Sequence, residues 1–150
     1  MGVRESLTNA FLDRSFKGLS SDEAAERLAA SGRALEAKWA GMSDTSEHRR
    51  LLRHIVGIER WGQSRLRVAL GAPLAMDEYD DYQPPADAAW SELQAAFRDT
   101  RQQTIDLARQ LIPAKADVKI PHNQFGKLTI SSWLRYLDLH ANMEAKKARR

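Results

Sequence analysis

The last helical pattern of the chain, over Leu128–Ala148, most constrains the fold because one of its faces changes character halfway along. Its first half carries apolar residues at helical spacing, at Ile130, Trp133, Leu134 and Leu137. The same face then continues through His140, Ala141 and Glu144. Residues four apart on a helix are neighbours, with Cβ atoms about 5–6 Å apart. His140 and Glu144 can therefore hold one metal ion together, or simply form a hydrogen bond.

Three earlier stretches have the same spacing of apolar residues and predict helices over about residues 20–42, 46–70 and 87–111. Ser20 or Ser21 is the expected start of the first, because a hydroxyl can cap the free amides of a helix. Pro113 ends the third, and Thr129 is the expected cap of the last helix. A short additional helix is predicted over residues 5–17.

Two long connections, residues 71–85 and 113–127, separate these helices. No strand pattern competes, since strict alternation is absent and turn signals do not recur at short intervals. The sequence therefore predicts an all-α fold, a four-helix bundle with long crossover loops and a short extra N-terminal helix. At this length the chain is expected to form a single domain over residues 1–150. Gly57, inside the second helix, indicates a close packing neighbour or a site.

Composition excludes several classes of function. The chain has no cysteine, which removes disulfides, thiolate ligands and a cysteine nucleophile, and which fits a cytoplasmic location. No apolar run approaches the roughly 20 residues that span a bilayer, so no membrane partner is expected. The N-terminus has no apolar segment typical of a signal peptide. There is no Gly-rich phosphate loop and no serine-centred nucleophile motif.

Charged clusters offer no clear partner. The basic residues that could touch phosphates are Arg49, Arg50 and Arg53, and the tail Lys146, Lys147, Arg149 and Arg150. A net charge of +3 and the lack of interleaved aromatic residues argue against nucleic acid. The acidic residues of the first connection are Asp77, Glu78, Asp80 and Asp81. They lack the spacing and the closing glutamate of a calcium loop, so a solvated loop is expected.

Two of the four histidines lie on or beside an apolar face, His54 in the second predicted helix and His140 in the last. With Glu144 they offer two nitrogens and a carboxylate, which zinc accepts, and three protein ligands leave a position open for water or substrate. The alternative is that both histidines are hydrogen-bonded core or boundary residues. His48, six residues before His54, is expected to be exposed, and His122 lies in a predicted loop with no role.

Two short motifs carry a resemblance to a known family. HIVGIERW, His54–Trp61, has a histidine before a small residue and a Glu-Arg pair, and FGKLTISSWLRYLDLHANME, Phe125–Glu144, has a tryptophan followed by a histidine. These motifs resemble the second-helix and last-helix segments of the DinB-like superfamily. Loop lengths and helix order are also similar, over roughly residues 20–148.

The resemblance implies an up-down-down-up bundle, often a homodimer. It also implies a divalent ion, commonly zinc or nickel, held by three histidines. Two of these ligand positions fall on His54 and His140, and the third falls on Glu144, where the family has a histidine. Glutamate ligates zinc at about 2.0–2.2 Å, so a site of altered composition can form. The branches it points to transfer low-molecular-weight thiols or isomerise with thiol cofactors.

Two hypotheses follow. In the first, the chain is a metal-dependent DinB-like protein, such as a thiol-dependent transferase of a small-molecule substrate, with its ion on His54, His140 and Glu144. In the second, it is a non-catalytic dimeric bundle that has lost the metal site and acts as a binding or assembly module. The first requires the three side chains to converge in the interior, with the two imidazole rings within about 8 Å, because zinc ligands lie about 2.0–2.1 Å from the ion.

Overall fold

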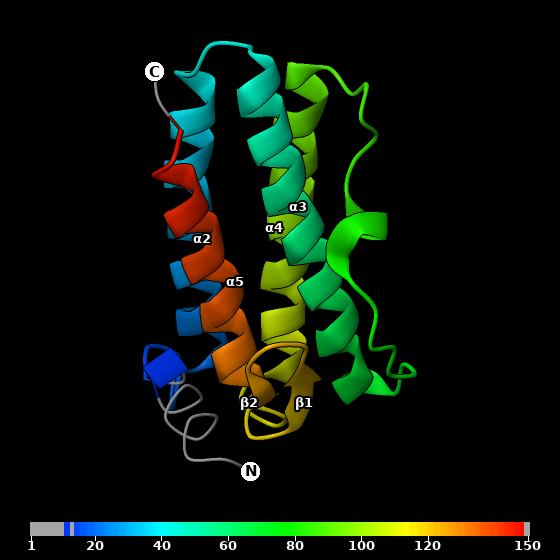
Figure 1. Ribbon diagram of the computed structural model, residues 1–150. Coiled ribbons are helices and arrows are strands. Elements are labelled where there is room, and N and C mark those ends of the chain that lie inside the picture. Colours follow the sequence, from blue (N-terminus) through cyan, green and yellow to red (C-terminus); the bar gives the residue numbers. More distant parts are fainter. Residues whose placement is uncertain (1–10, 13, 149–150) are drawn as a thin grey trace.

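The computed structural model describes residues 11–12 and 14–148, and most of this part of the chain is helical. The long helices are α2 (Ser21–Ala40), α3 (Ser46–Leu66), α4 (Trp90–Leu111) and α5 (Ile130–Ala145). They lie side by side, with α2 and α5 running in one direction and α3 and α4 in the other (Figure 1). The predicted mostly helical fold is confirmed.

The helix starts follow local signals. Ser20 Oγ accepts a hydrogen bond from the Glu23 amide, and the Glu23 carboxylate accepts one from the Ser20 amide, each at 3.1 Å. This capping box satisfies two amides that a helix start leaves free. Thr129 caps α5 in the predicted way, through a 3.1 Å bond from the Ser132 amide to its hydroxyl. Both predicted caps are confirmed.

Several boundaries differ from the prediction. The second predicted helix ends as an α-helix at Leu66 and continues as a 3₁₀ turn, η1 (Arg67–Leu70). The third begins at Trp90 instead of near residue 87. Of the N-terminal helix predicted over residues 5–17, the described part is helical at residues 11–12 and forms turns from residue 14, and the remainder lies outside the described residues.

The all-α prediction is wrong in one element, a β-hairpin before α5. Strands β1 (Lys119–His122) and β2 (Gly126–Thr129) pair antiparallel, with Lys119 opposite Thr129 and His122 opposite Gly126. Burial alternates in β1, where Ile120 and His122 point inward. Each strand has only four residues, which is too short for an alternation to stand out in the sequence.

The connection between α3 and α4 packs back along α3 and includes a short 3₁₀ helix, η2 (Tyr79–Tyr82). Its approach explains Gly57. A Cβ at this position would lie 2.6 Å from Gln83 Cγ, closer than packed atoms come. The glycine therefore lets the connection lie against the helix that carries His54.

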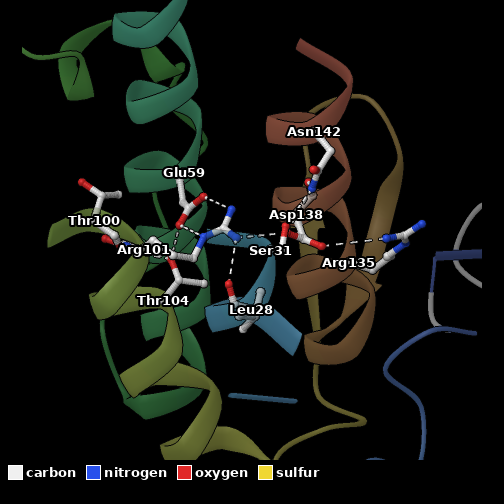
Figure 2. A network of polar contacts seen from close by, with 10 residues as sticks. Leu28, Ser31, Glu59, Thr100, Arg101, Thr104, Arg135, Asp138 and Asn142 are labelled. Atoms are coloured by element: carbon white, nitrogen blue, oxygen red, sulfur yellow. Dashed lines mark hydrogen bonds and ion pairs between the residues drawn. The ribbon is translucent and has the colours of Figure 1, made fainter. Parts of the chain in front are cut away.

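A buried polar network joins all four long helices (Figure 2). Arg101 of α4 donates from Nε and Nη2 to the two carboxylate oxygens of Glu59 in α3, each at 2.9 Å. Its Nη1 donates to Asp138 of α5 at 3.0 Å and to the carbonyl of Leu28 in α2 at 3.2 Å. The three charged side chains are at most 10% exposed, so this network fixes how the helices are aligned.

Helix α3 approaches α5 closely at Gly62. A Cβ there would lie 2.4 Å from Cδ2 and 2.8 Å from Cδ1 of Leu137, a side chain that is 1% exposed. We expect Gly62→Ala to lower the free energy of unfolding by about 1–2 kcal/mol. Overpacking a filled core costs about 1–3 kcal/mol, and two contacts below 3.0 Å place this change in the upper half of that range. The better helix propensity of alanine offsets about 1 kcal/mol of the cost. Urea unfolding measures the difference.

The matched control for Gly62→Ala is Gly41→Ala. The atoms nearest a Cβ at Gly41 are backbone oxygens at 3.7 Å and beyond, an ordinary contact. This change should alter the free energy of unfolding by less than about 0.5 kcal/mol. If Gly62→Ala were as stable as the parent protein, Leu137 would have to move aside freely, and the close approach would not matter.

Candidate metal centre

His54 and His140 face each other across α3 and α5. Their Nε2 atoms are 3.2 Å apart and form a hydrogen bond, and their ring centroids are 5.0 Å apart. The placement follows from the helix faces, since His140 lies one turn beyond the buried Leu137. The predicted convergence of the two rings is therefore confirmed.

Glu144 joins the two histidines from the next turn of α5. Its Oε1 lies 4.0 Å from His140 Nε2, and one ligating atom from each of the three residues lies within 4.8 Å of the others. The same oxygen accepts a 2.8 Å hydrogen bond from Lys147 Nζ, and the two side chains form an ion pair. The three side chains are half-buried and border cavities, so the predicted interior position is correct only in part.

The spacing of these donors fits a divalent ion. Two nitrogens bound tetrahedrally at about 2.0–2.1 Å lie about 3.3 Å apart, close to the 3.2 Å between the Nε2 atoms of His54 and His140. The carboxylate would have to approach by up to about 1.5 Å and share or release Lys147. The donor set suits zinc and nickel, which accept imidazole and carboxylate ligands.

Charge also favours the histidines as ligands. Burial lowers the pKa of His54, and burial together with the neighbouring His54 lowers the pKa of His140 to about 4. Burial alone would raise the pKa of Glu144, but the hydrogen bond from Lys147 and the nearby charges outweigh it, so its pKa is lowered. Near pH 7 both rings are therefore neutral, so a metal ion would not compete with an imidazolium charge, and the carboxylate is ionised.

Three cavities open beside the three residues, and two of them are lined by His54. The larger, of about 510 Å³, includes His54 and Glu144 in its wall and is bordered by the basic side chains of Arg50, Arg53 and Lys147. Tyr79 of η2 also lines it and meets the His54 ring edge to face at 5.0 Å. A smaller cavity of about 250 Å³ lies between His54, His140 and the hairpin. A small molecule therefore has room next to the candidate ligands.

Two histidine predictions are wrong. His48 was expected to be exposed, but it is 5% exposed and its Nδ1 lies 2.7 Å from the Ser43 carbonyl oxygen. His122 was expected in a loop, but it ends β1 and is 4% exposed. Ile120 and His122 alternate with exposed or half-buried residues in β1, but over four residues this pattern is too short to have predicted the hairpin that buries His122.

The acidic connection is also more than a solvated loop. The Asp77 carbonyl accepts hydrogen bonds from Trp61 Nε1 at 3.0 Å, Arg65 Nη2 at 3.1 Å and Asn123 Nδ2 at 2.9 Å. Its carboxylate accepts a 2.7 Å bond from the Tyr82 hydroxyl. These contacts fasten the connection to α3 and to the hairpin, and so hold the cavity wall in place.

We expect acid to destabilise the protein through His122. Burial, aided by the positive charge of Arg65, lowers the pKa of His122 to about 4, whereas an unfolded histidine titrates near 6.5. The unfolded chain then binds this proton first as the pH falls. Stability is complete above about pH 6.5 and declines toward pH 4, by up to about 3 kcal/mol. Urea titrations at several pH values measure this. The free energy of unfolding should fall less steeply with decreasing pH in His122→Asn than in the parent protein, and an equal fall in both would contradict the prediction.

No helix among the described residues is long and apolar enough to cross a membrane. A family model for the DinB superfamily matches residues 8–144, a range that contains all three candidate ligands. Neither the curated proteins nor the solved structures include a significant match to this chain.

Proposed function

The chain belongs to the DinB superfamily, and from this membership we propose that it is a divalent-metal protein whose ion is held by His54, His140 and Glu144. The proposed ion is zinc or nickel, bound by two imidazoles and one carboxylate. We also propose that residues 1–150 form one domain with the up-down-down-up order of the family. The opposed helix directions in Figure 1 support that order.

The observation that carries the proposal is the Nε2–Nε2 distance of 3.2 Å between His54 and His140. A metal ion at this position would use the lone pairs of two rings that are neutral near pH 7. Glu144 would add a negative charge, which favours a divalent cation over a neutral occupant. Lys147 holds this carboxylate at the edge of the larger cavity, beside the position expected for the ion.

For the reaction, we propose a thiol-dependent transfer to a small-molecule substrate. A bound divalent ion would supply stabilisation of a low-molecular-weight thiol as its thiolate. The larger cavity offers the space for the thiol, and Arg50, Arg53 and Lys147 would attract acidic groups to it. Tyr79 would restrain the His54 ring through their edge-to-face contact.

A second candidate is a non-catalytic dimeric bundle that acts as a binding or assembly module. Two contacts favour it. The hydrogen bond between His54 and His140, and the ion pair between Lys147 and Glu144, satisfy all three candidate ligands without an ion. A family member that has replaced one histidine by glutamate could keep this arrangement as structure alone.

Metal content separates the two candidates. The protein purified without a histidine tag should carry about one ion per chain, as expected for a three-ligand site. His54→Ala and His140→Ala should carry almost none, whereas the control His48→Ala should resemble the parent, because His48 is outside the ligand cluster. A parent protein without metal, which also fails to bind added zinc and nickel, would leave the binding module as the better proposal.

We further propose a homodimer, with a cytoplasmic location as a prediction from composition. Phe11 and Met143 are 58% and 56% exposed, and they border an apolar cavity of about 290 Å³ beside α5. Exposed apolar surface of this kind is typical of contact sites, and two-fold dimers are the commonest assemblies. Light scattering should report twice the chain mass of 16.9 kDa. A monomer from micromolar to millimolar concentration would contradict the proposal.

A further inference from the structure

His122 has a fixed tautomer. Its Nδ1 accepts hydrogen bonds from the backbone amides of Gln124 at 3.0 Å and Phe125 at 3.3 Å. A ring nitrogen that accepts a hydrogen bond carries no proton, so the proton of the neutral ring is on Nε2. The hairpin turn therefore presents a hydrogen-bond donor on the far side of the His122 ring.

This donor is buried and unused. His122 is 4% exposed, and its Nε2 has no hydrogen-bond partner among the residues that the structure describes. Buried polar groups in native proteins are nearly always paired, so an unpaired one needs an explanation. His122 lines the cavity of about 250 Å³ that His54 and His140 also line. Because the nitrogen itself is buried, a ligand in that cavity would satisfy it by moving into contact with this edge of the ring.

The surroundings hold the ring in place without a ligand. Phe125 stacks on it at 4.6 Å, and Tyr136 meets it edge to face at 4.5 Å. On either side of His122 in the sequence, Arg65 donates to the Pro121 carbonyl and to Asn123 Oδ1, both at 2.7 Å. A donor that is already positioned loses little freedom when it binds, which favours recognition.

We propose that His122 Nε2 binds a carbonyl or carboxylate oxygen of a small-molecule ligand in the cavity that it shares with His54 and His140. The proposal deepens the proposed function, because this ligand would lie against the metal site, but the hydrogen bond itself needs no metal. The cavity is smaller than a typical pocket for a drug-sized molecule, so it suits a small acyl group. Its aromatic walls, Trp61 and Tyr136, favour a flat one.

The ring would position the ligand without giving up its proton. With a pKa of about 4, His122 is neutral near pH 7 and is a hydrogen-bond donor, and not an imidazolium acid. A neutral imidazole in this role polarises a carbonyl oxygen that accepts its hydrogen bond. His122 is therefore a ligand-binding residue in this proposal.

The first test is nuclear magnetic resonance of the metal-free full chain with ¹⁵N-labelled histidine, using acetate and acetamide as probes. The His122 signals are assigned by their loss in His122→Asn. We expect the Nε2-protonated tautomer and a saturable shift with acetate, which would identify a carboxylate, or with acetamide, which would identify a neutral carbonyl. His48 lines the larger cavity, so a shift of its signals instead reports a probe that binds there.

An Nδ1-protonated ring, or no shift with either probe, would overturn the proposal. If the ring is protonated on Nε2 and neither probe shifts it, the Nε2 proton is directed at an aromatic face, such as that of Tyr136, and His122 only caps the hairpin. Line positions of His54 and His140 in the same spectra report whether a probe enters the cavity at all.

The second test separates ligand binding from metal binding. In His122→Asn the side-chain amide oxygen can still accept hydrogen bonds from the backbone amides of the turn, whereas the Nε2–H donor of the ring is lost. Affinity for the probe that shifts His122 should fall about tenfold, as expected for one lost hydrogen bond in a buried site. Zinc affinity should stay within about twofold of the parent, because His122 is not in the ligand cluster.

Failure of the proposed metal function and failure of this inference give different results. If the parent protein binds no zinc but acetate or acetamide still shifts His122, the proposed metal function fails and this inference stands. If zinc binds to His54 and His140 while neither probe affects His122, the metal function stands and this inference fails. An unchanged probe affinity in a folded His122→Asn protein would also contradict it.

Discussion

Replacing Arg101 by alanine should lower the free energy of unfolding by about 3–5 kcal/mol, the cost of breaking a buried ion pair from one side. The change would leave the carboxylates of Glu59 and Asp138 buried without their counter-ion. Burial by itself would lower the pKa of Arg101, but the two carboxylates outweigh it and raise the pKa, so the guanidinium is charged. Thermal and urea unfolding both measure the loss.

The matched control is Arg98→Ala on the same helix. Arg98 also forms a 2.8 Å ion pair, with Glu36, but its side chain is 65% exposed. Exposed pairs contribute less than about 1 kcal/mol, so this change should be nearly neutral. If Arg101→Ala were no more destabilising than Arg98→Ala, the network would not be what aligns α3 with α5.

The network also connects stability to the candidate site. Glu59 follows His54 in α3 by five residues, and Asp138 precedes His140 in α5 by two. The glutamate of the HIVGIERW motif is thereby explained, since Glu59 is 1% exposed and bound to Arg101. Glu59 therefore contributes by holding together the helices that carry the two histidines.

The sequence predicted the long helices well because their signals are local. The capping box of Ser20 and Glu23 lies within four residues, and the apolar stripes repeat over whole helices. The hairpin was missed because each of its strands has only four residues, too few for an alternation to be recognised. The end of α3 was missed by one turn, where α-helical bonding changes to 3₁₀ without a proline or glycine to mark it.

The candidate site, like the fold, was predicted from the sequence only in part. His54, His140 and Glu144 could be placed on inward helix faces by counting, and the structure brings them together. His122 could not, because its burial depends on Trp61 from α3 and on Trp133 and Tyr136 from α5. Contacts between residues this far apart in the chain leave no periodic signal.

Changing Glu144 should have the largest effect on function. We expect Glu144→Ala to weaken zinc binding by more than about 100-fold, since losing a ligand costs more than losing a supporting residue. Glu144→His should keep or strengthen binding, because it restores three imidazole donors. Calorimetric titration of zinc and nickel into the metal-stripped parent and both variants measures this.

The pH dependence of zinc binding to the parent protein provides an independent check. Histidine ligands must be deprotonated to bind metal, and the pKa of His140 is about 4 while that of His54 is lowered. Zinc uptake should therefore release few protons near pH 7, and affinity should be level above about pH 6.5 and decline toward pH 4. A steep loss already between pH 8 and 7 would mean that other groups bind the ion.

The Lys147 ion pair makes the result for Glu144 decisive. In the structure Glu144 is already satisfied by Lys147 at 2.8 Å, so a vestigial site would lose only this surface contact in Glu144→Ala. Parent and variant would then take up equally negligible metal, and the binding module would be the better interpretation. Tight binding that is unchanged in Glu144→Ala would instead mean that His54 and His140 hold the ion without the carboxylate. Only a clear loss in Glu144→Ala, with binding retained in Glu144→His, assigns the carboxylate as the third ligand.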